Sequence, residues 1–170
     1  SKEDWRRAGK AYREAIALKP KEAGAYYNLG VALGNSGHNV DAAQRYLEAK
    51  ERSPVGSKLW ALTTAAAFDM LRLPECAEAT KPEWWNDEAL KALSARVAWA
   101  APDAEVTNSM RAEVLSGKTY GAWEAGPRSA AELKAAAMHF DQCVALCDAP
   151  AMKVEFASYA DWCRSKAEAM

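Results

Sequence analysis

Apolar and small residues recur every three or four positions along most of this chain, which is the spacing of one face of an α-helix. Two such stripes follow one another in the segment 23–54: Tyr26, Leu29, Gly30 and Leu33, then Ala42, Tyr46 and Ala49. Gly37 lies between them and Pro54 comes after the second, at the positions where helices end. The pattern predicts two successive helices, the second capped by Asn39 or Asp41.

Four prolines divide the chain at related intervals. They are Pro20, Pro54, Pro102 and Pro150, with spacings of 34, 48 and 48 residues. Ten residues after each of them stands a small side chain: Gly30, Thr64, Ala112 and Ala160. Small residues are expected where two helices cross at close range. The shared spacing therefore predicts a repeated helical hairpin in which each proline ends one unit.

The segment from Ala23 to Pro54 resembles the tetratricopeptide repeat (TPR), a two-helix unit of 34 residues. Its Gly30, Ala42 and Tyr46 stand at the family's positions, and residues 1–20 resemble the second helix of a preceding unit. The resemblance weakens after Pro54. It implies an all-α, right-handed TPR-like α-solenoid of about eight helices. We expect one domain over 1–170: a half repeat (1–20), a regular repeat (21–54), two extended repeats (55–102 and 103–150) and a capping helix (151–170).

The two extended repeats carry inserted segments between their helices. One reads LPECAEATKPEWW and the other GKTYGAWEAGP. Asn86 follows the first and is a good N-cap for a helix over 87–101. We expect further helices from Asp103, over 129–147 and over 151–169. The last has one apolar and one charged side, so Met170 is expected to be a genuine C-terminus.

Composition and charge narrow the class of protein. Half of the residues are hydrophobic and the net charge is −1, which disfavours nucleic acid or an anionic membrane as the main partner. No apolar run reaches the length of a membrane span. Cys76, Cys143, Cys147 and Cys163 form no C-x-x-C pair. Cys143 and Cys147 share a helical face, but the absence of further ligands nearby favours buried thiols over a metal or redox site.

No catalytic motif is present, so we expect no enzymatic activity, no cofactor and no metal. In the TPR family, an asparagine on the first helix often hydrogen-bonds an extended peptide. Asn28 occupies that position, with Tyr27, Val31 and Asn35 on the same side. A clamp for a C-terminal carboxylate would need Lys and Asn where Tyr27 and Val31 stand. Asn28 is therefore either a peptide contact or an ordinary surface residue.

The inserted segments supply a second candidate surface. Trp84 and Trp85 lie in one segment, and Tyr120 and Trp123 lie in the other. Since both segments connect the two helices of a hairpin, they should emerge at the same edge of the stack. Tryptophan and tyrosine are the residues that interfaces favour as anchors. These rings either bind a partner or fold back to fill gaps in the degenerate repeats.

The function expected is a protein-interaction scaffold or adaptor. The alternatives are a structural subunit, or the end of a longer repeat protein, within a multiprotein assembly. RNA binding is a weaker alternative because the charge is near neutral. Partners are expected to be proteins, with no nucleic acid and no membrane span, and dimerisation through the N-terminal half repeat stays open. We expect an intracellular, soluble protein whose targeting segment, if it has one, precedes Ser1.

Overall fold

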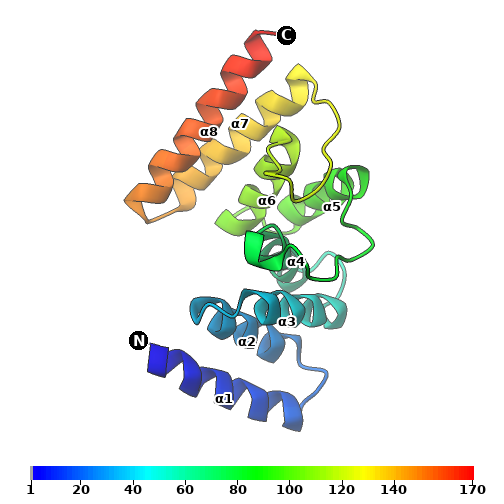
Figure 1. The fold of residues 1–170 in the computed structure, drawn as a ribbon, viewed down its shortest axis with the longest axis vertical. Coiled ribbons are helices and arrows are strands. Elements are labelled where there is room, and N and C mark those ends of the chain that lie inside the picture. Colours follow the sequence, from blue (N-terminus) through cyan, green and yellow to red (C-terminus); the bar gives the residue numbers. More distant parts are fainter. Residues whose placement is uncertain (1) are drawn as a thin grey trace. The chain divides into compact units, whose positions relative to one another are not determined.

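The computed structural model describes residues 2–170, with side chains from Asp4 onward, and this part of the chain is entirely helical (Figure 1). It forms the helices α1 (Lys2–Leu18), α2 (Ala23–Asn35), α3 (Asn39–Arg52), α4 (Lys58–Leu71), α5 (Asp87–Ala100), α6 (Glu105–Ser116), α7 (Ala130–Leu146) and α8 (Pro150–Glu168), and the 3-10 turn η1 (Pro74–Cys76). Residues 2–170 contain no β-strand. The predicted all-α fold with about eight helices is confirmed.

The chain divides into two compact units, Ser1–Lys81 and Pro82–Met170. The boundary lies in the first inserted segment, inside the extended repeat predicted for 55–102. In the first unit α1 packs on α2, α2 on α3, and α3 on α4. In the second unit α5 packs on α6, α6 on α7, and α7 on α8. Each helix therefore packs against its neighbour in sequence within its unit, which is the arrangement of a helical repeat. The proposed division into individual repeats stays a prediction.

The turn between α2 and α3 ends the first helix as predicted. Gly37 adopts a left-handed conformation with φ of 82°. The N–H of Gly37 donates to the carbonyl of Gly34, and the N–H of His38 donates to the carbonyl of Leu33. This is the Schellman arrangement, which satisfies the last carbonyls of a helix. The capping prediction was wrong, because Asn39 already belongs to α3 and His38 precedes it without a side-chain cap bond. Asp41 lies in the first turn instead, where a negative charge is favourable.

Gly30 marks the closest approach between α2 and α3. A Cβ atom at this position would lie 2.7 Å from Cε1 and 2.8 Å from Cδ1 of Tyr46. The small residue therefore makes room for an aromatic ring of α3. The Tyr46 ring is buried and lies 5.7 Å from the ring of Tyr27. Thr64, Ala112 and Ala160 are also fully buried in their helices, and their equivalence to Gly30 stays a prediction.

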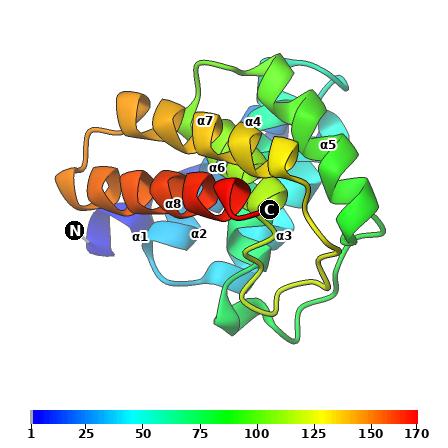
Figure 2. The ribbon, with the colours of Figure 1, turned by 90° about the horizontal axis from the view of Figure 1, so that it is seen from above.

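The core of the second unit lies between α6, α7 and α8. Its buried side chains include Ala112, Leu115, Ala136, Phe140, Cys143, Phe156, Ala160 and Cys163. Phe140 lies 6.2 Å from Phe156 and 5.5 Å from Tyr159, measured between ring centroids. The ribbons of α7 and α8 run side by side in Figures 1 and 2. Burying the apolar stripe of α8 leaves its charged side in water, which confirms the predicted amphipathic last helix.

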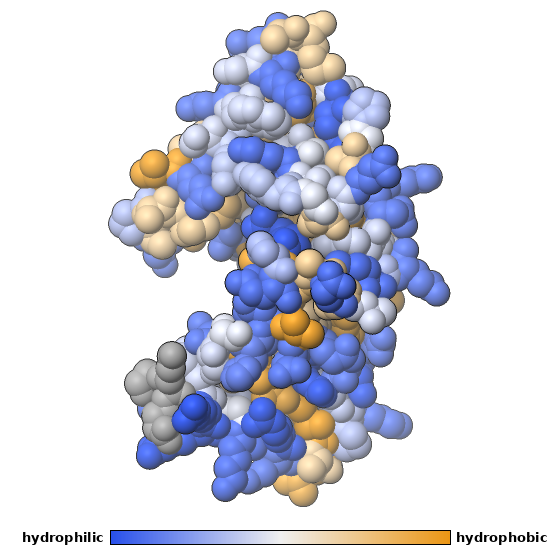
Figure 3. All heavy atoms as spheres, viewed as in Figure 1, coloured by the Kyte–Doolittle hydropathy of each residue, from blue (hydrophilic) through white to orange (hydrophobic). Residues whose placement is uncertain are grey.

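On the face shown in Figure 3 the surface of each unit is mostly polar, with apolar residues in small patches. Within residues 2–170 no helix combines the length and the apolar character needed to span a bilayer.

Candidate functional site

The exposed face of α2 carries the first set of predicted partner-binding residues. Tyr27 and Val31 are half-buried and pack against the apolar cluster formed by α2, α3 and α4. Burial raises the pKa of Tyr27, so its phenol stays neutral. Asn35 is exposed, but its amide nitrogen donates to the carbonyl of Val31 at 2.9 Å. Asn28 is exposed and makes no hydrogen bond within the described residues. Between the two asparagines, only Asn28 has a side-chain amide whose N–H donors and oxygen acceptor are both unused by the described residues.

Helix α4 lies next to α2 in the same unit and continues this surface. Leu62, 34 residues after Asn28, is half-buried on α4. Near the other end of α4, the carboxylate of Asp69 accepts a hydrogen bond from Arg72 at 3.0 Å. Asn28 thus has no amide counterpart on the next first helix, as the sequence indicated.

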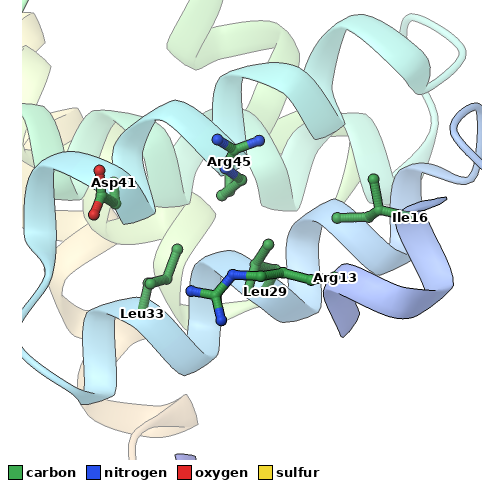
Figure 4. Close-up of a pocket in the computed structure, with 6 residues that line it drawn as sticks. All are labelled: Arg13, Ile16, Leu29, Leu33, Asp41 and Arg45. Carbon is green, nitrogen blue, oxygen red and sulfur yellow. The ribbon is translucent and has the colours of Figure 1, made fainter. Parts of the chain in front are cut away.

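A pocket that sequence reasoning missed lies between α1, α2 and α3 (Figure 4). Its volume is about 350 Å³, and its lining is apolar at Ile16, Leu29 and Leu33 and charged at Arg13, Asp41 and Arg45. A smaller pocket of about 130 Å³ shares Arg13 and Leu33 with it. The sequence carried no indication of this site, because its residues belong to three helices and come together only in the packed unit. The pocket can accept an aliphatic side chain next to a carboxylate.

Arg13 is the cationic group of this pocket that is free to bind. It makes no hydrogen bond or ion pair with any described residue. Arg45, in contrast, forms an ion pair with Glu48 at 2.6 Å.

The aromatic residues of the two inserted segments meet in the second unit. The ring of Trp85 lies 5.7 Å from that of Trp84 and 6.0 Å, edge to face, from that of Trp123. Its indole N–H donates to the carbonyl of Ala122 at 2.8 Å. Trp123 is 8% exposed, whereas Trp84 and Trp85 are half-buried. The segments therefore come together at one edge, where Trp123 forms part of the packing between them.

A buried ion pair fastens the second inserted segment to the start of α5. The Arg128 side chain is 3% exposed, and its NH1 donates to Oδ2 of Asp87 at 2.9 Å. It also donates to the carbonyl of Val114. The other donors to Asp87 are the indole of Trp123 and the backbone N–H of Gly126. A buried arginine with all these partners holds the segment in one conformation.

The electrostatics of Asp87 follow from these contacts. Burial by itself would raise the pKa of this carboxyl group. The hydrogen bonds from Arg128, Trp123 and Gly126 outweigh burial and lower the pKa to about 2. The pKa of Glu132 also falls to about 2, because Lys91 and the N–H of Ser129 hydrogen-bond its carboxylate. Both acids are therefore ionised at neutral pH, where Asp87 holds the C-terminal half of this segment and Glu132 holds the start of α7.

Tyr120 occupies the most open position among the predicted aromatic residues. It is 67% exposed and has a φ of 50°, a left-handed conformation that is uncommon outside glycine. Its hydroxyl donates to the hydroxyl of Tyr159 at 3.3 Å. The structure thus places Tyr120 at the surface, beside α8 and apart from the buried Trp123.

Three of the four cysteines are buried, and His139 pairs with a buried side chain. Cys76, Cys143 and Cys163 are buried free thiols, and Cys147 is half-buried. Burial raises the pKa of Cys143 to about 12, so it stays protonated. His139 lies 2.9 Å from the amide oxygen of the buried Asn108, through its Nδ1. Among the side chains described from Asp4 onward, no three of His, Cys, Asp or Glu are grouped as a metal site would require.

Comparison with known proteins agrees with this arrangement. The model of the TPR repeat matches residues 1–37, which span α1, α2 and the left-handed Gly37. A search of curated proteins finds no match to the chain. The matched residues join the predicted half repeat to the first helix of the regular repeat, and every helix of each unit packs on its neighbour in sequence. Residues 1–37 of the chain therefore match a tetratricopeptide repeat, and the helices that follow keep the sequential packing of a helical repeat.

Proposed function

We propose that this protein is a non-catalytic scaffold that binds a partner protein through the exposed face of α2 and through its inserted aromatic segments. TPR repeats are in general protein-interaction modules, and the matched repeat includes α2. The proposed partner is a protein, and the proposed contacts are Asn28 with its neighbours on α2 and the aromatic residues of the inserted segments.

The observation that carries the proposal is the unused amide of Asn28. Its side chain is exposed on the helix that the family model matches, and it bonds to no described residue. An amide offers two donors and one acceptor oxygen, so it can pair with both the N–H and the C=O of an extended peptide. Tyr27 and Val31 beside it are half-buried and supply a fixed apolar border.

The inserted segments support a second contact area. Trp84 and Trp85 are half-buried and Trp123 packs against Trp85, whereas Tyr120 is exposed beside α8. A rigid aromatic surface loses little side-chain entropy on binding, which is why such residues often dominate interface energies. In this proposal Trp123 acts by positioning its neighbours.

The proposal is tested on the full chain by identifying a partner in native extract and then measuring its affinity for purified variants. Asn28→Ala should weaken binding by more than about fivefold, which corresponds to roughly 1 kcal/mol. The matched control is Gln44→Ala, an exposed amide on α3. Equal affinities for the Asn28 and Gln44 variants would refute the role of Asn28.

The aromatic surface is tested separately with Trp84→Ala and Tyr120→Ala. Trp99→Ala serves as the control, because Trp99 is 82% exposed on α5 outside the inserted segments. We expect weaker binding from the first two variants and unchanged binding from the third, with circular dichroism unchanged in all three. If Trp99→Ala weakened binding as much as the others, the partner would contact a different surface.

Self-association through α1 is the second candidate. Trp5 and Leu18 are exposed apolar residues on this helix. Sedimentation of the full chain should then give a dimer that Leu18→Glu converts to a monomer. A monomer at all concentrations would exclude this alternative.

A further inference from the structure

Three aromatic rings surround the ammonium group of Lys118. Its Nζ lies 4.1 Å from the ring centroid of Tyr159, 5.2 Å from that of Trp162 and 5.7 Å from that of Tyr120. All three distances are within the range in which a cation is attracted to a π-face. Lys118 and Tyr120 belong to the second inserted segment, and the other two rings belong to α8. We call these three rings the aromatic cage.

The cage is held in shape by the protein core. The Tyr159 ring lies against the buried Phe140 at 5.5 Å between centroids. The Tyr159 hydroxyl donates to Glu155 at 2.6 Å and accepts from the hydroxyl of Tyr120 at 3.3 Å. Two of the three rings are therefore joined by a hydrogen bond, and one of them, Tyr159, also packs on the core.

The ammonium inside the cage has no hydrogen-bond acceptor among the described protein groups. Lys118 Nζ has three N–H donors, but it makes no hydrogen bond or ion pair with any described residue. Only the π-faces hold it. A trimethylammonium group carries the same charge and has no N–H to satisfy, so it loses less hydration on entering the cage. Aromatic cages suit such groups for this reason.

We propose that the aromatic cage is a binding site for a trimethyllysine side chain of a partner protein, and that Lys118 occupies it in the free protein. The inference rests on the proposed function, which supplies the protein source of the ammonium. It adds Tyr159 and Trp162 of α8, which neither proposed binding surface includes.

A trimethylammonium group from solvent can reach the cage and replace the Lys118 ammonium. Tyr120 is 67% exposed, Trp162 is 37% exposed and Lys118 is half-buried, so the cage faces solvent. A second ammonium, that of Lys166, lies 4.8 Å from the Trp162 ring. An external cation that replaces Lys118 would leave the number of cations on the cluster unchanged, with Lys166 still beside Trp162. Lys118 acts as an internal competitor that lowers the apparent affinity.

The test uses the full chain and follows the indole N–H resonance of Trp162 by NMR, assigned with Trp162→Phe. The probes are N-acetyl-trimethyllysine amide, its unmethylated counterpart, choline, and 3,3-dimethylbutan-1-ol, the uncharged isostere of choline. We expect Lys118→Ala to bind the trimethyllysine probe about tenfold more tightly than the unchanged protein. Lys134→Ala, an exposed lysine on α7, is the matched control and should leave the affinity unchanged.

Further variants separate the cage from general apolar binding. In the Lys118→Ala background, Trp162→Ala should abolish binding and Trp162→Phe should retain part of it, as measured by isothermal titration calorimetry because both variants lack the Trp162 indole. Trp162 is partly exposed, so these changes should leave the fold intact. Equal binding of methylated and unmethylated probes, or no shift of the Trp162 resonance, would overturn the proposal. Equal binding of choline and the peptide probe would overturn its assignment to a protein ligand, and binding of the neutral isostere would overturn the cation–π basis. Loss of partner binding in Asn28→Ala is unaffected by any of these results, so the two proposals fail separately.

Discussion

Adding a single methyl group at Gly30 is expected to destabilise the first unit, although alanine is the better helix former. The new Cβ would lie 2.7 Å from Cε1, 2.8 Å from Cδ1 and 3.1 Å from Cζ of Tyr46. These distances are well inside van der Waals contact. The Tyr46 ring is buried and lies against Tyr27. The ring therefore has little room to move away, and either α3 or the ring must shift.

The magnitude follows from two opposing terms. Replacing glycine by alanine in a helix interior stabilises it by about 0.8–1.0 kcal/mol. Overpacking a buried site costs about 1–3 kcal/mol. We expect a net loss of about 1 kcal/mol for Gly30→Ala, and a larger loss for Gly30→Leu, which adds three more carbon atoms at the same crossing.

The same helix offers a matched control. A Cβ at Gly34 would lie 3.8 Å from Cβ of Ala42 and from Sδ of Met70, which is ordinary contact. Gly34→Ala should therefore stabilise the protein by up to about 1 kcal/mol. The measurement is the free energy of unfolding from urea titrations followed by far-UV circular dichroism. The two alanine variants should move the transition in opposite directions.

A double-mutant cycle identifies the clash. In a Tyr46→Leu background the ring is absent, so Gly30→Ala should become neutral or stabilising. If Gly30→Ala is as stable as Gly34→Ala in the unchanged protein, the close approach of α2 to the Tyr46 ring is not present in solution.

Three further outcomes are expected in the second unit. The pKa of Asp87 is lowered from 3.8 to about 2, so its stabilising contribution, on the order of 2 kcal/mol, is present above about pH 4 and is lost as the pH falls toward 2. The difference in unfolding free energy between the unchanged protein and Asp87→Asn should shrink over that range, and a constant difference would contradict the ion pair with Arg128. Ser129→Ala removes a capping box at the start of α7 and should cost about 0.5–2 kcal/mol in the urea transition, whereas no loss would mean the box does not form. With a thiol reagent at about pH 8, Cys147 should react quickly and Cys143 only as the protein unfolds, since burial raises the Cys143 pKa to about 12; comparable rates, read by mass spectrometry, would show that α7 opens.

The positions of the helices were predictable because their determinants are local. The stripe around Leu29 and Leu33, the left-handed Gly37 and the N-cap Asn86 each act within a few residues of themselves. The helices that the sequence predicted are present, and the ends of α5, α7 and α8 lie within one or two residues of the predicted ends. The exception at His38 arose because α3 starts two residues ahead of Asp41, without using a side-chain cap.

The candidate sites depended on contacts between residues far apart in sequence. Trp85 and Trp123 were equally compatible with an interface and with a packed position. The hydrogen bond from Trp85 to Ala122 and the burial of Trp123 decide how these rings are held. No local pattern could have paired Asp87 with Arg128, which stands 41 residues away.

By itself, the sequence determined the helical class and the glycine turn that ends α2, because periodicity and turn residues act along the chain. Tertiary structure decided which ring fills the space at Gly30, how the two inserted segments meet, and that Lys118 lies among three aromatic rings. These features arise from side chains of different helices and loops approaching in space, and their distances are set only when each unit packs.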